Sequence, residues 1–287
     1  MKIIFFGTPR FAQIVLEKLI DSPFRPSIVV TATDAKFGRG QKLTPSPVKQ
    51  TALKNDIGVL QPKSLSSVAS QLSDVDLAIL VAYGRIIPKE ILSIPKYGFV
   101  NVHPSLLPKY RGPSPVQSAI LAGDEKTGVS IMILDEQVDH GSILAQKEIP
   151  IEKDDTLSQM AEKLALAGAK LLIETLPYYL DGAIVPQPQN HKEATFTKHI
   201  SKQDGYVDLK NPPDKKTFDR MVRAFYPWPT VWTKLKTNDE RLMTIKFLPE
   251  GKIQPEGKRS MSINEFRNGY PQVSEKIEGL FKDKAQS

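Results

Sequence analysis

The sequence contains no cysteine among its 287 residues. A chain without thiols cannot form a disulfide framework, a thiolate zinc site or a cysteine nucleophile. It also lacks any apolar run of about 18 residues, so no segment is expected to span a membrane. The apolar stretch that opens the chain stops at Gly7 and is too short for the core of a signal peptide. Together these absences favour a cytoplasmic protein with no membrane partner.

Motifs for metals and dinucleotides are missing as well. Histidine is rare, with 4 residues, and no cluster of His, Asp and Glu has the spacing of a metal site, so no metal is expected. Gly7-Thr8-Pro9 follows an apolar run, but it lacks the second and third glycine of a dinucleotide fingerprint. We therefore interpret it as a simple turn.

Positive charge is what the chain has in excess, with 39 Lys and Arg against 32 Asp and Glu. This excess is a mild indication of an anionic partner, although many basic enzymes have none. Residues 35–50 concentrate the charge in a stretch rich in Gly and Pro that contains no acid. Such a loop suits contact with RNA phosphates, and the alternative is a solvated loop. Its cations are Lys36, Arg39, Lys42 and Lys49.

Apolar runs alternate with helical patterns along most of the chain. Strands are expected near residues 2–6, 27–32, 77–82, 99–103, 128–134 and 142–146. Helices are expected at 11–20, 115–122 and 155–180. Thr156 is the expected cap of the longest helix, and residues 33–48 have no periodicity. The alternation predicts an α/β domain with a largely parallel sheet.

The composition changes towards the carboxyl terminus. Residues 1–185 form the expected α/β domain, and residues 186–203 are rich in Pro, Gln, Lys and His, which is typical of a linker. Residues 204–287 are expected to form a small, mostly β domain. Its predicted elements are a helix at 214–224 and strands at 231–236 and 243–247.

Two polar side chains, Asn101 and His103, stand at the end of a predicted strand. At positions i and i+2 they project from the same face, and ligands of parallel sheets bind beyond the carboxyl ends of strands. His titrates near neutral pH, and an amide can donate to an oxygen that becomes negative. The pair therefore suits acyl transfer through a tetrahedral intermediate. The alternative is that both are ordinary strand-end residues.

A third group should orient the histidine. Asp139, on a loop between two predicted strands, is the candidate, and Asp135 and Glu136 compete for the role on sequence alone. No Ser, Cys or Lys is placed as an obvious acyl-carrying nucleophile, which favours direct attack by a substrate amine. The other histidines are expected to be structural or inert: His140, His191 and His199.

These motifs together resemble the methionyl-tRNA formyltransferases, from the first strand to about residue 235. The matching segments are FFGTPRFA, GRGQKLTPSPVK, LVAYGRIIPK, NVHPSLLPKYRGPSPVQSAI, TGVSIMILDEQVDHGSIL and RAFYPWPTVW. The HxSLLPxYRG pattern is highly specific for folate-dependent formyltransferases. The segment GRGQKLTPSPVK is similar to the tRNA-binding insertion of this family.

The resemblance implies a fold, a reaction and partners. It implies a Rossmann-like formyltransferase domain followed by a small OB-like domain. Nothing in the sequence demands more than a monomer. The donor would be 10-formyltetrahydrofolate, and the acceptor would be the amino group of methionine on initiator Met-tRNA, for translation initiation. Asp139 would hold His103, while Asn101 and His103 would stabilise the oxyanion as the amine attacks the formyl carbon.

The resemblance also assigns binding residues. The four cations of residues 35–50 would approach the acceptor end of the tRNA. The residues that would line the folate site are Tyr83, Gly84, Ser105, Leu106, Leu107 and Pro108.

The carboxyl-terminal part departs from the family pattern. After Trp232 there is neither a GTIL-like nor a GDG-like turn, and only residues 242–247 and 257–262 resemble the end of the barrel. We therefore expect a shortened β domain. This shortening favours a second hypothesis, a sugar-nucleotide N-formyltransferase with the same donor, but such an enzyme has little use for the basic loop. A third hypothesis, a non-catalytic RNA-binding relative, has no need of the Asn, His and Asp trio.

Overall fold

The structure is a computed structural model, and it describes residues 1–37, 40–236 and 241–281. The chain divides into two compact units. The first unit comprises Met1–Pro115, Lys126–Pro150 and Ala161–Thr197. The second unit comprises Val116–Glu125, Ile151–Met160 and Lys198–Ser287.

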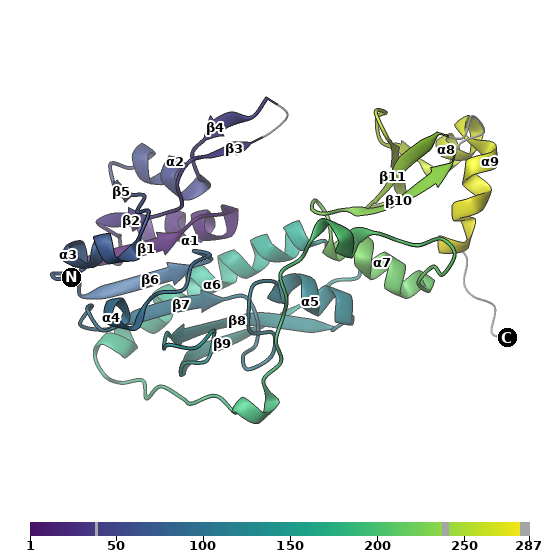
Figure 1. Ribbon diagram of the computed structural model, residues 1–287. Helices are drawn as coiled ribbons and strands as arrows, with labels where there is room; N and C mark the ends of the chain where they lie inside the picture. Colours follow the sequence, from purple (N-terminus) through teal and green to yellow (C-terminus); the bar gives the residue numbers. More distant parts are fainter. Residues whose placement is uncertain (38–39, 237–240, 282–287) are drawn as a thin grey trace. The chain divides into compact units, whose positions relative to one another are not determined.

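A seven-stranded sheet forms the centre of the first unit, in the order β5-β2-β1-β6-β7-β8-β9 (Figure 1). The first five of these strands are parallel, whereas β8 and β9 pair antiparallel. Their bounds are β1 Ile3–Gly7, β2 Ile28–Val30, β5 Gly58–Leu60, β6 Leu77–Val81, β7 Phe99–His103, β8 Lys126–Ile133 and β9 Ile143–Pro150. The predicted α/β class with a largely parallel sheet is confirmed.

The first strands are apolar throughout because both faces of the sheet are buried. In β1, Ile3 and Phe5 pack into one core cluster, and Ile4 and Phe6 pack into another. This division follows from the alternation of side chains along a strand, and continuous apolar runs are typical of parallel sheets covered on both faces. The sheet therefore offers ligands its strand ends and not its faces.

Helices of the first unit cover the sheet. They are α1 Arg10–Ile20, α2 Pro47–Lys54, α3 Ala69–Leu72, α4 Lys89–Leu92 and most of α6 Leu157–Leu180. The cap predicted at Thr156 is confirmed, because the Gln159 backbone N–H donates to Thr156 Oγ1 at 3.5 Å and Gln159 Oε1 accepts from the Thr156 N–H at 2.9 Å. This reciprocal pair satisfies backbone donors at the start of the longest helix.

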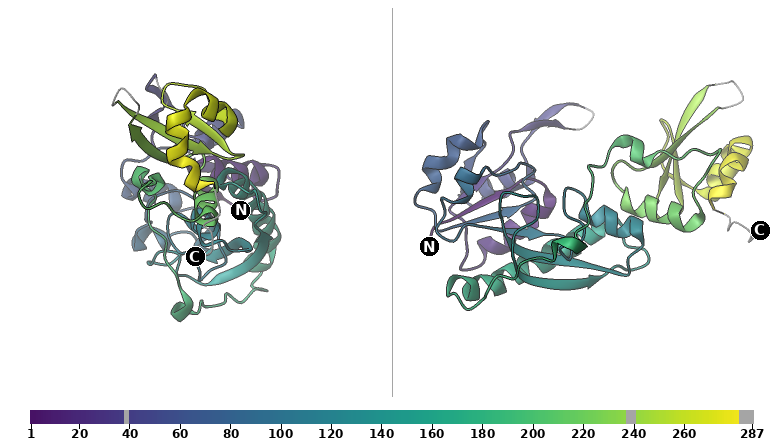
Figure 2. Two further views of the ribbon diagram at one scale, coloured as in Figure 1. Left: turned by 90° about the vertical axis from the view of Figure 1, so that its right-hand side faces the viewer. Right: turned by 60° about the horizontal axis from the view of Figure 1, so that its bottom comes forward.

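The basic segment contains a hairpin, so the expectation of a stretch without regular structure was wrong. Strands β3 (Ala35–Phe37) and β4 (Lys42–Thr44) pair antiparallel. The hairpin projects away from the rest of the first unit (Figures 1 and 2). It follows β2 directly, so it begins at the carboxyl edge of the parallel strands. This is the sheet edge at which ligands bind in such folds.

The second unit is a small antiparallel sheet with short helices. Its sheet order is β10-β11-β12-β13, and exposed and buried residues alternate along β10. The core includes Phe218, Phe247 and Ile253, with the Phe218 and Phe247 rings edge to face at 5.1 Å. The elements are α5 Pro115–Ala122, α7 Lys215–Ala224, β10 Val231–Lys236, β11 Leu242–Leu248, β12 Lys252–Pro255, β13 Met261–Ser262, α8 Ile263–Gly269 and α9 Pro271–Ser274. The predicted mostly β character is confirmed.

The segment predicted as a linker is bound to the first unit along much of its length. Gln187 pairs with Ile143, and the Arg111 backbone N–H donates to the Thr195 carbonyl at 2.8 Å. The Thr197 N–H donates in turn to the Arg111 carbonyl at 2.7 Å. Residues 187–197 therefore brace the loop that follows β7. Among the residues that the structure describes, no helix is long and apolar enough to cross a membrane.

Candidate active site

Strand β7 holds both polar candidates, each 5% exposed. Val100 and Val102 point to the core cluster that contains residues of α6, so Asn101 and His103 project from the opposite face. A Cβ on Gly168 of α6 would lie 2.6 Å from Val102 Cγ1. Helix and strand therefore pack closely at this position.

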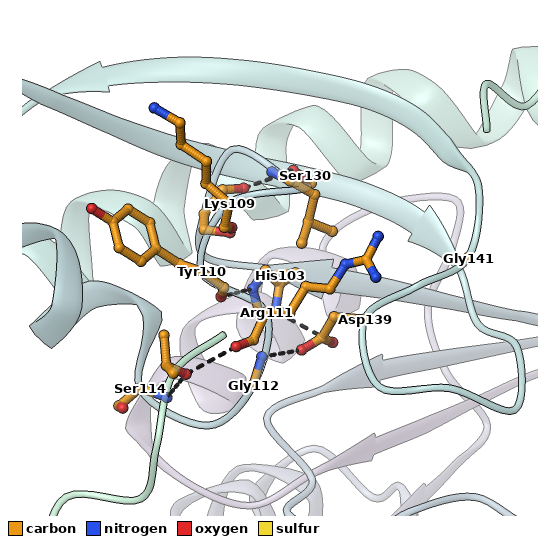
Figure 3. A network of polar contacts seen from close by, with 12 residues as sticks. His103, Lys109, Tyr110, Arg111, Gly112, Ser114, Ser130, Asp139 and Gly141 are labelled. Carbon is orange, nitrogen blue, oxygen red and sulfur yellow. Dashed lines mark hydrogen bonds and ion pairs between the residues drawn. The ribbon is translucent and has the colours of Figure 1, made fainter. Parts of the chain in front are cut away.

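The imidazole of His103 lies between two oxygen atoms (Figure 3). Nε2 is 3.1 Å from the carbonyl oxygen of Tyr110, and Nδ1 is 3.5 Å from Asp139 Oδ1. A carbonyl oxygen can only accept, so Nε2 carries a hydrogen and donates it to Tyr110. The other edge of the ring faces a carboxylate. The Tyr110 carbonyl orients the ring, and the Asp139 carboxylate lies where it can stabilise a second proton on Nδ1.

The three candidate acids, Asp135, Glu136 and Asp139, have different partners in the structure. Asp139 Oδ2 accepts from the Gly112 N–H at 2.7 Å, and its side chain is 14% exposed. Asp135 Oδ2 instead lies 2.6 Å from His140 Nδ1. Glu136 pairs with Lys89 at 2.6 Å. Asp139 is thus the acid that the structure brings to His103.

A cavity of about 130 Å³ opens beside these groups, and both Asn101 and Asp139 line it. Within the described residues, the Asn101 amide makes no side-chain hydrogen bond, so it is free to bind a ligand oxygen. The other lining residues are Leu80, Arg85, Ile86, Ile87, Leu92, Leu134, Asp135, Glu136, Gln137 and Val138. Apolar walls with a few converging polar groups are typical of small-molecule sites.

The residues predicted to line a folate site are outside this lining. Ser105 is fully buried, and its Oγ donates to the Lys109 carbonyl at 2.7 Å. The Leu107 N–H donates to Ser130 Oγ at 3.1 Å, so this loop is tied to β8. Leu106 and Pro108 belong to the same loop. These residues shape the turn that carries Tyr110 and Gly112 to His103 and Asp139.

The other two predicted folate residues follow β6. Tyr83 is 3% exposed and packs edge to face on Phe6. Burial raises the pKa of its phenol, and its hydroxyl has no hydrogen-bond partner among the described residues. Gly84 has a φ of +81°, and the space where a Cβ would lie is open. Sequence reasoning missed the next residues, Arg85 to Ile87, although they stand in a quoted motif and line the cavity.

The predicted cations divide into three cases. Lys36 and Lys42 are exposed on the hairpin. Lys49 is not: its ammonium lies 2.8 Å from Asp34 Oδ2 and 2.7 Å from Gln61 Oε1. A hydrogen bond from Lys49 is the main cause that lowers the pKa of Asp34, and a hydrogen bond from Gln61 lowers it further. Arg39 lies outside the described residues.

Comparison with known proteins identifies the family. The sequence profile of the formyl transferase family matches residues 1–176. A methionyl-tRNA formyltransferase of Enterococcus faecalis is 38% identical, over 96% of this chain and 98% of the relative. This chain belongs to the methionyl-tRNA formyltransferase family. A second member, from Roseiflexus castenholzii, is 45% identical over 81% of this chain and 76% of its own length.

The methionyl-tRNA formyltransferase family is a family of enzymes, so the predicted enzyme class is confirmed. The alignment with the Enterococcus faecalis protein spans 309 positions, which exceeds the 287 residues of this chain. That relative therefore has residues with no counterpart in this chain. A sugar N-formyltransferase from a Shewanella species shares the fold, with a TM-score of 0.63 and 19% identity over 87% of this chain and 98% of its own. No group of three or more metal-ligating side chains occurs in the described ranges.

Proposed function

We propose that this enzyme moves the formyl group of 10-formyltetrahydrofolate to the amino group of methionine on initiator Met-tRNA, and that Asn101, His103 and Asp139 carry the reaction. The observation that supports the residue assignment is that the free Asn101 amide and the Asp139 carboxylate line one cavity, with His103 3.5 Å from Asp139. The product is the aminoacyl-tRNA used to initiate translation.

The proposed reaction needs no covalent enzyme intermediate. The neutral amine attacks the formyl carbon, the bond from that carbon to the folate nitrogen breaks, and one proton passes from the amine to the folate nitrogen. The Asn101 amide donates to the oxygen that becomes negative, which favours the tetrahedral intermediate. His103 is placed to move the proton from the amine towards the folate nitrogen. It can also donate its Nε2 hydrogen to the oxygen that becomes negative, in competition with the Tyr110 carbonyl.

The cavity beside Asn101 is the proposed entry for the donor. Its volume of about 130 Å³ suits part of a ligand and not a whole folate. The apolar walls would take the flat ring of the donor, and Asn101 and Asp139 supply polar groups in the same lining. Tyr83, Gly84 and residues 105–108 would support these walls from behind.

Phosphate contacts are proposed for the hairpin. Lys36 and Lys42 are exposed at the carboxyl edge of the parallel strands, where the formyl acceptor must arrive. In the second unit, Lys234, Lys236 and Lys246 lie on the exposed face of β10 and β11. Both cation groups could contact RNA, and counterion release would make binding salt-dependent.

The deciding experiment measures formyl transfer from 10-formyltetrahydrofolate to three acceptors: initiator Met-tRNA, elongator Met-tRNA and an amino-sugar nucleotide. Transfer to the initiator tRNA supports the proposal. Transfer only to the sugar nucleotide would overturn it, and the shortened second unit would then belong to a sugar enzyme. Asn101→Ala and His103→Ala should lower kcat about 100-fold or more with tRNA affinity unchanged.

Location, assembly and metal content complete the proposal: a cytoplasmic monomer that needs no metal. Light scattering should give a mass near 32.0 kDa. Dialysis against a chelator should leave the transfer rate unchanged. A stable dimer or a rate restored by added metal would contradict these points.

A further inference from the structure

The loop that carries Asp139 is held by a side chain from a distant part of the sequence. Gln189 is 6% exposed. Its Nε2 donates to the Asp139 carbonyl at 2.9 Å and to the Gly141 carbonyl at 2.8 Å. Asp139 has a φ of +48°, a conformation that non-glycine residues rarely adopt. Such a backbone persists only where surrounding contacts hold it, and Gln189 supplies two of them.

The same amide also holds a buried arginine. Gln189 Oε1 accepts from Arg111 Nε at 3.2 Å and from Arg111 NH2 at 2.6 Å. Arg111 is 3% exposed. Its burial lowers the pKa of the guanidinium, and the charges of Asp139 and Asp135 oppose this. A buried cation is stabilised only when it is paired and hydrogen-bonded, so the Gln189 oxygen and the nearby acids keep Arg111 in place.

One further acceptor completes the surroundings of Arg111. Its NH2 lies 2.9 Å from His191 Nδ1. A guanidinium only donates, so Nδ1 must carry a lone pair and His191 must be neutral in this arrangement. The His191 ring stacks on His140, with centroids 3.9 Å apart and planes 3° apart. His140 Nδ1 in turn meets Asp135 Oδ2 at 2.6 Å.

We propose that Gln189 and His191 are positioning residues for formyl transfer: they hold Asp139 against His103, Gln189 directly through the backbone and His191 through Arg111. This inference rests on the proposed catalytic role of Asp139. Both residues come from the segment after α6, which was predicted from the sequence to be a linker with an inert His191. Neither touches the cavity beside Asn101. Their effect should therefore appear in turnover and not in substrate binding.

The network also predicts that the rate of formyl transfer falls at acid pH. Burial lowers the pKa of His191 below its ordinary value, and the charges of His140 and Arg111 lower it further, while Asp135 opposes them. These three residues are the titratable or charged groups that face His191 from the elements packed against it. The neutral acceptor is present above the lowered pKa and is lost as the pH falls through it. Acid should then release Arg111 and, with it, one support of Asp139.

Substitutions can separate the contacts of Gln189. Gln189→Leu removes all of them, whereas Gln189→Glu keeps an acceptor for Arg111 and loses the donor to the two carbonyls. Both should lower kcat about 10- to 100-fold with the KM for tRNA within a factor of two, because a misplaced catalytic group slows the reaction step. Gln187→Leu is the matched control, since that side chain is exposed, and it should behave as the wild type.

The His191 contact is tested by a conservative rescue. His191→Ala should lose about tenfold in kcat, whereas His191→Asn should retain most activity, because its Oδ1 can accept from Arg111. The asparagine variant cannot titrate, so the part of the acid fall in kcat due to His191 should disappear. Equal losses in the alanine and asparagine variants would overturn the role of His191. A Gln189→Leu enzyme equal to Gln187→Leu would overturn the role of Gln189.

A measurement that needs no substrate can test the positioning role of Gln189 and His191 independently of the proposed function. The chain has 4 histidines, so nitrogen NMR can assign each ring. We expect an unprotonated Nδ1 on His191 at pH 7.5, and His103 signals that change in Gln189→Leu as they do in Asp139→Ala. Unchanged His103 signals would overturn the positioning role. A wild-type enzyme that formylates no Met-tRNA would instead reject the proposed function, and the NMR result would still decide the network.

Discussion

Asp139→Asn is the most informative single change because it removes a charge and keeps the shape. In the native site the carboxylate faces His103 Nδ1 at 3.5 Å and accepts from the Gly112 N–H at 2.7 Å. Asparagine can keep the second contact through Oδ1. The change therefore isolates the attraction between the carboxylate and a proton that passes to the imidazole during the reaction.

The magnitude follows from the distance. Two opposite unit charges 3.5 Å apart attract by about 5 kcal/mol at an effective dielectric constant of about 20. Asp139 is 14% exposed, so solvent screens part of this attraction, and the asparagine dipole replaces another part. If about half is lost, the barrier rises by about 2.5 kcal/mol, which corresponds to a rate about 70-fold lower.

The assay is kcat and KM for formyl transfer from 10-formyltetrahydrofolate to initiator Met-tRNA. Glu148→Gln is the control, because that acid lies outside the cavity lining and forms an exposed pair with Lys126. Exposed pairs contribute about 0–1 kcal/mol, so the control should change kcat by less than about fivefold. Asp139→Asn within a factor of three of the wild type, or a control that loses as much, would refute the electrostatic role.

Three other predictions concern stability and RNA binding. Gly168→Ala should lower the free energy of unfolding by about 1 kcal/mol, because its Cβ would lie 2.6 Å from Val102 Cγ1. This loss outweighs the better helix propensity of alanine. Thermal melts should show the control Leu166→Ala, at an exposed position, nearly unchanged. Hydrogen bonds from Lys198 and Ser201 lower the pKa of Asp204 to about 2, so Asp204→Asn should cost about 1–2 kcal/mol at pH 7. That difference is complete above the unfolded pKa and should vanish as the pH falls through about 2; a constant difference across this range contradicts the assignment. Replacing both Lys36 and Lys42 by Ala should reduce the salt dependence of tRNA binding by about two units of slope, whereas Lys49→Ala should leave it unchanged, because Asp34 already pairs that ammonium.

Local patterns predicted the strand that carries Asn101 and His103, and also the next helix along the chain. The strand at 99–103 and the helix at 115–122 have the expected bounds. Strand alternation alone places Asn101 and His103 on one face, because consecutive side chains of a strand point to opposite sides. The carboxyl-edge location followed from the α/β class. Each of these conclusions depends on residues close together in the sequence.

Contacts between distant segments could not be predicted in the same way. Asp135, Glu136 and Asp139 all stand within one loop, and only the folded loop shows which carboxylate reaches His103. Gln189 contacts the Asp139 carbonyl across 50 positions of sequence. No periodicity relates such residues. The pairing of Lys49 with Asp34 could not be predicted from the sequence for the same reason.

The sequence by itself determined the fold class, the family and the strand-end pair of Asn101 and His103, because alternation, helical spacing and motifs are properties of neighbouring residues. Only the tertiary structure decided which acid faces His103, which cations remain exposed and how Gln189, Arg111 and His191 surround Asp139. Those arrangements depend on how segments far apart in the chain pack together. Packing is decided by the whole core and by the satisfaction of buried polar groups, and no single stretch of sequence contains that information.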